Sequence, residues 1–261
     1  MWASYPQTGP AIGFLLANGC VLALSAALTE DQLLAWGWRV PFWCAGLLTL
    51  IGFLLRSRIA ETPVFQGLAR DDALARSPLR TVLRRHPSRV LLVAGAVTCT
   101  YAVHYTATAW AMSHLAGRPG FTATGTLLCL MAAMTVMAAA TPVAAALGDR
   151  YGRRTLSIAG CVAMGVTAVP YLALLGTGGL ATLWACTTVT LLALITMLGV
   201  QGAYIPELFA PGLRTSGTAV SYNLGAVLGG ALTPLINSRL RSRRATACPG
   251  RWRPTSWGCA W

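Results

Sequence analysis

Residues 124–154 decide the fold: the apolar stretch TGTLLCLMAAMTVMAAATPVAAAL (Thr124–Leu147) runs directly into the basic heptapeptide GDRYGRR (Gly148–Arg154). The apolar stretch has no charged residue, and it is longer than the about 20 apolar residues that a helix needs to cross a bilayer. A second apolar stretch, Thr155–Leu175, follows at once. The sequence therefore predicts two membrane-spanning helices joined by a tight, Arg-rich turn.

The same alternation of apolar stretches and short connections extends over most of the chain. Only 10% of its 261 residues are charged and 55% are hydrophobic, whereas a soluble globular domain carries about 25% charged residues. This composition excludes a soluble enzyme, a disordered tail and a secreted disulfide scaffold. In hydrocarbon every backbone polar group needs an internal partner, so the stretches are predicted to be helices. We expect an all-α polytopic membrane protein with about seven transmembrane helices: Gly9–Leu28, Val40–Leu55, Val90–Leu115, Thr124–Leu147, Thr155–Leu175, Ala181–Tyr204 and Gly217–Ile236.

The charges are lopsided, because 20 Arg, no Lys and 7 acidic residues give a net charge of +13. A strongly basic chain can be a nucleic-acid binder, but these Arg residues lie between the apolar stretches. If all seven stretches cross, the connections on one side hold 12 Arg and those on the other side hold 2. Membrane proteins keep Arg-rich loops in the cytoplasm. The N-terminus and the long connection 56–89 are therefore predicted to be cytoplasmic, and no nucleic-acid partner is expected.

The tail, residues 237–261, does not follow this pattern. It carries six Arg together with Trp, Pro and Cys, and it contains no apolar run. We expect it to be disordered. One interpretation is that it replaces a further span, as after a shifted or misassembled reading frame, and the other is that it is a genuine basic tail.

The most specific motif is Gly148-Asp149-Arg150-Tyr151-Gly152-Arg153-Arg154. An ordinary positive-inside turn would explain its Arg residues but not the spacing of its glycines and aspartate. The motif resembles the signature loop of the major facilitator superfamily, with Ala145 in place of the first glycine. Two further stretches are similar to the metabolite–proton symporter branch, which includes shikimate, α-ketoglutarate, citrate and proline/betaine permeases. They are Trp36–Phe42 with Arg58–Phe65, and Pro206-Glu207-Leu208-Phe209 followed by Arg214 and Gly217.

This resemblance implies that the seven stretches are spans five to eleven of a twelve-span fold. Residues 1–55 would be the last two spans of the N-terminal half, 56–89 the central loop, and 90–236 a C-terminal bundle of five spans. The implied function is secondary active transport of a small organic acid or zwitterionic metabolite, by proton symport, in a bacterial plasma (inner) membrane. A lipid bilayer, a substrate and a proton are the expected partners, and the protein is expected to be a monomer. The alternative is a truncated, transport-incompetent fragment.

The resemblance also assigns roles to the two loop motifs. Gly148, Asp149, Arg150, Gly152, Arg153 and Arg154 would form a cytoplasmic gating latch. Pro206, Glu207, Arg214 and Gly217 would form a second loop motif.

Few side chains within the spans could bind a substrate or a proton. His104 is the only ionisable residue deep in a span, and Tyr101, Tyr105 and Thr108 recur with it at helical spacing, so they share one face. An ionisable group at such depth indicates a functional site, although a neutral histidine bonded within the bundle explains it as well. His86 and His114 lie at loop edges, where we expect solvation. Four further polar residues could contact the substrate or join helices: Asn18, Gln201, Tyr204 and Asn223.

Neither enzymatic nor metal-binding patterns occur. The sequence has no G-x-S-x-G, H-E-x-x-H or P-loop motif, and no pair of carboxylates within a span. Six of the eight cysteines lie in apolar stretches, where cysteine acts as a small hydrophobe. We therefore expect no enzyme activity, no cofactor and no metal.

Overall fold

The computed structural model describes residues 5–58, 78–175, 178–233, 235–236 and 239. Most of these residues are helical, and none of them lies in a strand. This confirms the expected all-α class. The long helices are α1 (Tyr5–Ala27), α3 (Val40–Ser57), α6 (Pro87–Tyr105), α8 (Ala123–Tyr151), α9 (Arg153–Leu174), α10 (Leu180–Glu207) and α11 (Arg214–Ala226). Short helices between them are α2 (Glu30–Ala35), η2 (Gly37–Arg39), α5 (Pro78–Arg85), η3 (Thr106–Trp110), α7 (Ala111–Leu115), η4 (Pro211–Leu213) and η5 (Val227–Ala231).

Six of the helices in the described part of the chain are long and apolar enough to cross a membrane. They correspond to the first six predicted stretches. The predicted seventh, Gly217–Ile236, forms α11 and η5 but is not among the six. The stretch contains Thr218, Ser221 and Asn223 and several glycines, which lower its apolar content. The numbering of the spans within a twelve-span fold stays a prediction.

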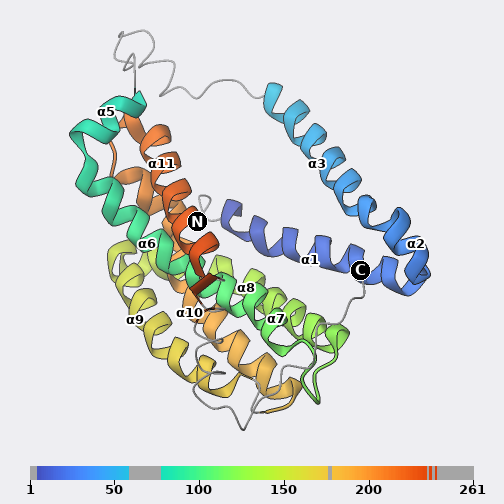
Figure 1. The fold of residues 1–261 in the computed structure, drawn as a ribbon. Helices are drawn as coiled ribbons and strands as arrows, with labels where there is room; N and C mark the ends of the chain where they lie inside the picture. The colour runs from blue at the N-terminus through green and yellow to red at the C-terminus, as the bar shows by residue number, and fades with distance from the viewer. Residues whose placement is uncertain (1–4, 59–77, 176–177, 234, 237–238, 240–261) are drawn as a thin grey trace.

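The helices form a bundle in which α10 packs against both α8 and α9 (Figure 1). Helix α6 packs against α11 and η5 on the neighbouring side, and α1 lies along α8. Helix α3 stands apart in Figure 1 and has no buried residue. The main hydrophobic core lies between α8, α9 and α10, with Met134, Met137 and Leu194 fully enclosed.

Glycines allow the central helices to approach closely. A Cβ added to Gly148 in α8 would collide with Val200 of α10, and one added to Gly160 in α9 would lie 2.8 Å from Met197. On the other side, a Cβ on Gly225 of α11 would lie 2.6 Å from Val97 of α6. Small residues at these contacts are what membrane bundles use in place of a hydrophobic driving force.

The ends of the helices follow local chemistry. Thr122 caps α8 by accepting a hydrogen bond from Gly125 N–H at 3.1 Å. Helices α8 and α9 are separated only by Gly152, whose φ of +91° favours a residue without a side chain. The helix thus continues through Gly148–Tyr151, which the sequence analysis assigned to the turn.

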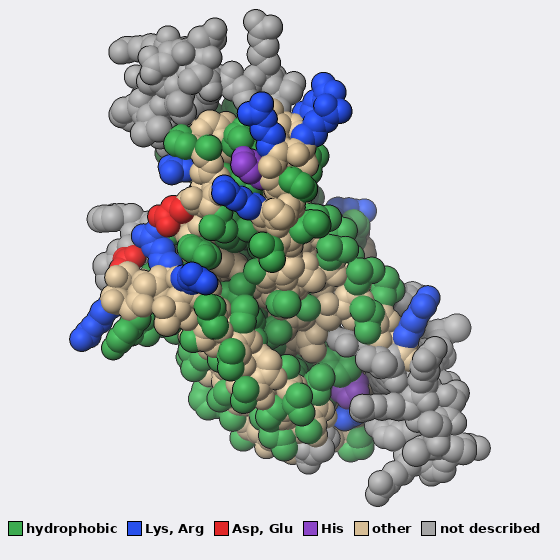
Figure 2. Space-filling model, turned by 90° about the vertical axis from the view of Figure 1, so that its left-hand side faces the viewer, with side chains coloured by type: hydrophobic (Ala, Val, Ile, Leu, Met, Phe, Trp, Pro, Cys, Tyr) green, Lys and Arg blue, Asp and Glu red, His purple; other side chains and the backbone are tan. Residues whose placement is uncertain are grey.

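One end of the bundle carries most of the charge. Figure 2 shows many Arg side chains and the visible acidic side chains on the upper part of one face, and mainly hydrophobic side chains over its middle and lower part. We call this end, which holds Arg89, Arg153, Arg154, Glu207 and Arg214, the Arg-rich end. Of the predicted loop 56–89, the described part includes helix α5, and residues 59–77 lie outside the described residues. The predicted tail also lies outside them, apart from Arg239.

Candidate functional site

The Arg-rich end brings the two loop motifs together through Arg153. This residue begins α9, directly after the turn at Gly152. Its guanidinium forms an ion pair with Glu207 at the end of α10, and its Nη2 lies 3.4 Å from Oδ1 of Asp149 in α8. The three side chains remain 32%, 54% and 40% exposed for Arg153, Glu207 and Asp149. One cation therefore joins the ends of three helices at the surface of the bundle.

Two further arginines hold the backbone that follows α10. Arg89 of α6 donates from Nη1 to the carbonyl of Leu208 at 2.9 Å, and Arg214 donates from Nε to the carbonyl of Phe209 at 3.3 Å. These bonds satisfy carbonyls that have no partner within the helix, and they place positive charge where the helix dipole is negative. Gly217 belongs to the same assembly, because a Cβ there would lie 2.5 Å from Cδ1 of the Phe209 ring.

The other two arginines of the GDRYGRR motif do not join this contact. Arg150 lies over the ring of Tyr151, with 5.5 Å between its Cζ and the ring centroid. Arg154 is exposed and, among the described residues, makes no ion pair or hydrogen bond. Of the residues predicted to form the latch, Asp149 and Arg153 are thus joined with Glu207 of the second motif, while Arg154 lines a cavity. The latch role itself stays a prediction.

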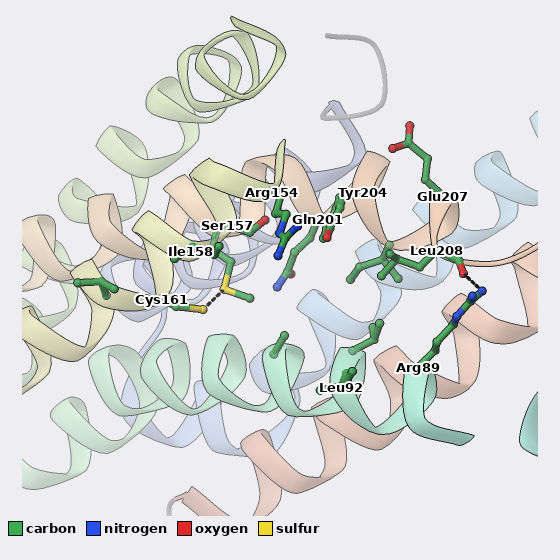
Figure 3. A pocket seen from close by; sticks show the side chains of 15 residues that line it. Arg89, Leu92, Arg154, Ser157, Ile158, Cys161, Gln201, Tyr204, Glu207 and Leu208 are labelled. Atoms are coloured by element: carbon green, nitrogen blue, oxygen red, sulfur yellow. Dashed lines mark hydrogen bonds between the residues drawn. The ribbon is translucent and has the colours of Figure 1, made fainter. Parts of the chain in front are cut away.

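This cavity, which we call the α6–α9–α10 cavity, has a volume of about 670 Å³. That volume lies within the range of about 300–1,000 Å³ that small-molecule sites occupy. Its wall is mostly apolar, with polar side chains toward the Arg-rich end (Figure 3). The polar and charged residues that line it are Arg89, Arg154, Ser157, Gln201, Tyr204 and Glu207.

Gln201 is the most deeply placed polar residue of this cavity, with an exposed fraction of 2%. Its Nε2 donates to Thr100 Oγ1 at 3.0 Å, and the Thr100 hydroxyl donates in turn to the carbonyl of Ala96 at 3.1 Å. Its Oε1 is buried and has no hydrogen-bond partner among the described residues. A buried amide oxygen without a partner is uncommon and asks for an explanation.

A second, smaller cavity of about 390 Å³ lies between α1, α8 and the junction of α6 with η3. It brings together His104, Tyr105, Thr108 and Asn18, all of which the sequence analysis singled out. The His104 ring meets Tyr105 edge-on, with 5.7 Å between centroids, and its nitrogens make no hydrogen bond within the described part of the chain. The adjoining segment η3 is a π-helix, a departure from α-helical geometry that is frequent at functional sites.

The remaining candidates lie elsewhere. Tyr101 stacks on Tyr105 at 6.2 Å and packs against Gly229 of η5. Asn223 is exposed on α11, where its Nδ2 donates to the carbonyl of Ala219 at 2.8 Å. Neither residue lines one of the two cavities described here.

His114 differs from the sequence-based expectation. It is only partly exposed, its ring stacks on Trp110 with 4.5 Å between centroids, and its Nε2 lies 2.7 Å from Nη2 of Arg118. The helix continues through α7, so that Trp110 and Arg118 lie four residues on either side of His114 and reach its ring. The expectation of a solvated His114 is therefore wrong.

Sequence reasoning missed several residues that the cavity brings together. Arg89 was only one of many positive charges in a loop, and Thr100 and Ser157 gave no signal at all. Arg89 and Thr100 act through contacts with residues more than 100 positions away, whereas Ser157 bonds to its own helix and lines the cavity. Only the position of Arg89 at the start of an apolar stretch could have drawn attention to it.

The described residues contain no cluster of metal-ligating side chains. Within those ranges, no three His, Cys, Asp or Glu side chains gather in a way that could hold a metal ion.

Comparisons with known proteins give the family context. A family model described as Major Facilitator Superfamily matches residues 2–234. The inner membrane metabolite transport protein YhjE of Escherichia coli K12 is 32% identical over 255 residues, covering 96% of this chain and 58% of the relative. The shikimate transporter of the same organism is 30% identical over 261 residues, covering 96% and 57%. The glycine betaine/proline/ectoine/pipecolic acid transporter OusA of Dickeya dadantii is 30% identical over 242 residues, covering 89% and 48%.

The chain thus spans about half the length of the curated relatives that it matches. No solved structure gives a significant match. The matches confirm the family and the metabolite-transporter relatives that the motifs predicted.

Proposed function

Because this chain belongs to the Major Facilitator Superfamily, we propose that it serves secondary active transport of a small organic acid or zwitterionic metabolite, by proton symport. The relatives named for metabolite, shikimate and proline/betaine transport support this substrate class. We place the protein in a bacterial inner membrane, with the Arg-rich end in the cytoplasm. The unequal distribution of Arg between alternate connections supports that orientation.

The observation that carries the proposal is the contact of Arg153 with Glu207 and Asp149. It joins two motifs that lie 54 residues apart in the sequence, at the ends of α9 and α10. The contact lies at the mouth of the α6–α9–α10 cavity, because Glu207 is also part of the cavity wall. When it is formed, a charged contact at that place can keep the helices around the cavity in one arrangement. When it is broken, the helices can adopt another.

Exposed ion pairs suit such a role. A pair with this degree of exposure is worth less than about 1 kcal/mol, so it can form and break during a transport cycle. Secondary transporters expose a central site alternately to the two sides by moving one group of helices against another. In this proposal the latch favours one of the two arrangements, and its loss shifts the equilibrium toward the other.

The second cavity supplies a candidate proton carrier. Among the residues that line it, His104 is the one whose side chain can carry a positive charge. Histidine changes its charge within the physiological pH range when its environment allows it. In this proposal His104 binds a proton or an acidic group of the substrate, with Tyr105 and Asn18 beside it.

Uptake by reconstituted vesicles tests the proposal. The purified chain is inserted into liposomes, and entry of radiolabelled L-proline, shikimate and glycine betaine is measured with and without an inward proton gradient. We expect gradient-driven uptake of at least one of the three, abolished by a protonophore. Asp149→Asn and Arg153→Gln should change the rate, whereas Glu30→Gln, on the distant helix α2, should not.

The result that contradicts the proposal is an absence of uptake by vesicles in which the chain is correctly inserted. In that case the second interpretation from the sequence holds, namely that this chain alone moves no substrate. Protease added outside intact cells checks the orientation, since cleavage within 56–89 would place that connection outside the cell.

A further inference from the structure

The α6–α9–α10 cavity opens sideways from the bundle. Helices α6 and α9 both pack on α10 but touch each other only slightly, so a groove runs between them. Leu92 of α6 and Ile158 and Val162 of α9 line this groove, and they are 75%, 56% and 61% exposed. In helices that cross a bilayer, apolar side chains with such exposure face the hydrocarbon. The groove is therefore accessible from within the membrane.

The two walls of the groove share one pattern, a cation followed by apolar side chains on the same face of the helix. The spacing of these residues is three, four, seven or eight positions, which keeps each set on one helix face. Both helices begin at the Arg-rich end, so the two cations lie at the same end of the groove. The lining residues that form the pattern are Arg89, Leu92, Val93 and Ala96 in α6, and Arg154, Ile158, Cys161 and Val162 in α9.

The charged end of the groove has a net positive charge. Glu207, the acidic residue of the lining, is paired with Arg153. Arg154 makes no ion pair with the described residues, and Figure 3 shows its side chain directed into the cavity. Arg89 donates from Nη1 to the carbonyl of Leu208, and a guanidinium has further N–H groups for a second acceptor. This end of the groove is therefore complementary to an anion.

We propose that the groove between α6 and α9 holds an anionic phospholipid, with its phosphate at Arg154 and Arg89 and one acyl chain along Leu92, Ile158 and Val162. Basic pockets between membrane helices on the cytoplasmic side bind anionic lipid headgroups, and guanidinium groups suit phosphate oxygens. The acyl chain covers apolar side chains that water would otherwise hydrate. A hydrophilic solute would satisfy the charged end alone. The inference goes beyond the proposed transport function and does not depend on it.

Native mass spectrometry of the purified full chain in detergent tests this assignment. The chain is mixed with equal amounts of dioleoyl phosphatidylglycerol and dioleoyl phosphatidylcholine, which have the same acyl chains and differ in net charge. Each arginine near a membrane surface strengthens the binding of anionic lipid about fivefold. We therefore expect a single phosphatidylglycerol to stay bound to the chain, about 5- to 30-fold more tightly than phosphatidylcholine.

Variants at the charged end test the headgroup contacts. Arg154→Gln and Arg89→Gln should each weaken phosphatidylglycerol binding about fivefold. Phosphatidylcholine binding should stay unchanged, which also shows that the variants are folded. The double variant should bind the two lipids alike. Arg56→Gln removes the same charge from the last turn of α3, outside the groove, and should keep the wild-type preference.

A second pair of variants tests the apolar part of the groove. Ala96→Leu fills the space between α6 and α9 and should weaken the binding of both lipids. Ala159→Leu makes the same change at an exposed position of α9 that does not line the cavity, and it should weaken neither. Circular dichroism checks that both variants keep the helix content of the wild type.

The proposal is overturned if the wild-type chain retains the two lipids equally, if the two arginine variants keep its preference, or if Arg56→Gln loses that preference to the same extent. Displacement of the lipid by an equal concentration of glycerol 3-phosphate would exclude the acyl chain from the groove. A dimer without bound phosphatidylglycerol would show that a second copy of the chain covers it. Lipid preference without uptake by vesicles supports this site and contradicts transport, and uptake without lipid preference does the reverse.

Discussion

Replacing Glu207 with glutamine removes one carboxylate from the latch and keeps the size of the side chain. Arg153 loses its partner on α10 and retains Asp149, 3.4 Å away on α8. The link between the α8–α9 turn and the end of α10 is therefore cut, while the turn itself stays paired. We expect the α6–α9–α10 cavity to open more often in this variant.

The free energy lost with this ion pair follows from the exposure of its two side chains. Arg153 is 32% exposed and Glu207 is 54% exposed, so water and salt screen their attraction. Exposed pairs contribute about 0.2–1 kcal/mol, and the direct contact places this pair in the upper half of that range. A change of about 0.5–1 kcal/mol shifts a two-state equilibrium by a factor of about 2–5.

Alkylation of a cysteine at position 157 measures the opening. Ser157 lines the cavity about one helical turn from Arg153, so a maleimide reaches Ser157→Cys when the cavity is open. Labelling is located by mass spectrometry, which separates it from the natural cysteines. We expect Glu207→Gln to speed labelling about 2- to 5-fold at low salt and less at about 1 M salt, where the screening length falls to about 3 Å.

Two controls decide whether the latch is the cause. Glu30→Gln removes the same charge from α2, which is distant from the cavity, and should leave the labelling rate unchanged. In a double-mutant cycle, Glu207→Gln should have no further effect once Arg153 has been replaced by glutamine. Equal labelling of wild type and Glu207→Gln at low salt would refute the reasoning, as would an equal increase in Glu30→Gln.

Two further predictions concern packing and the second cavity. Gly148→Ala should lower the free energy of unfolding by about 1–3 kcal/mol, because its Cβ collides with Val200 of α10. Gly165→Ala, which meets nothing within 4 Å, should leave stability unchanged or raise it, and thermal unfolding in detergent followed by circular dichroism compares the two. His104→Leu should reduce gradient-driven uptake about 10-fold, the effect of losing one hydrogen bond to a charged group. Val103→Leu on the same helix should not, and equal initial rates for the two variants between pH 5 and 8 would remove His104 from the mechanism.

The sequence predicted the helices well because the bilayer imposes a simple requirement. Long apolar runs must be helical in hydrocarbon, and each of the first six predicted stretches coincides with a long helix. The residues at which the helices end were less predictable. Helix α8 continues from the predicted Leu147 to Tyr151, because apolar composition reports where the membrane ends and not where the helix ends. Backbone bonding continues into the polar region until Gly152 interrupts it.

The candidate site was predictable only in part. The GDRYGRR motif identified the right turn, and the alternation of spans placed it on the same side as Glu207. The ion pair itself depends on how α9 and α10 pack, which local sequence does not reveal. The same holds for Gln201 and Thr100, which are 101 residues apart and meet only because α10 crosses α6.

The periodicity of the helix gives two consecutive arginines different roles. Successive residues of an α-helix point about 100° apart, so Arg153 and Arg154 at the start of α9 cannot face the same partner. Arg153 reaches Asp149 and Glu207, whereas Arg154 turns to the cavity. Because the two side chains share one turn of helix, a movement that separates Arg153 from Glu207 must also displace Arg154. The latch and the α6–α9–α10 cavity are thus linked mechanically through the first turn of α9.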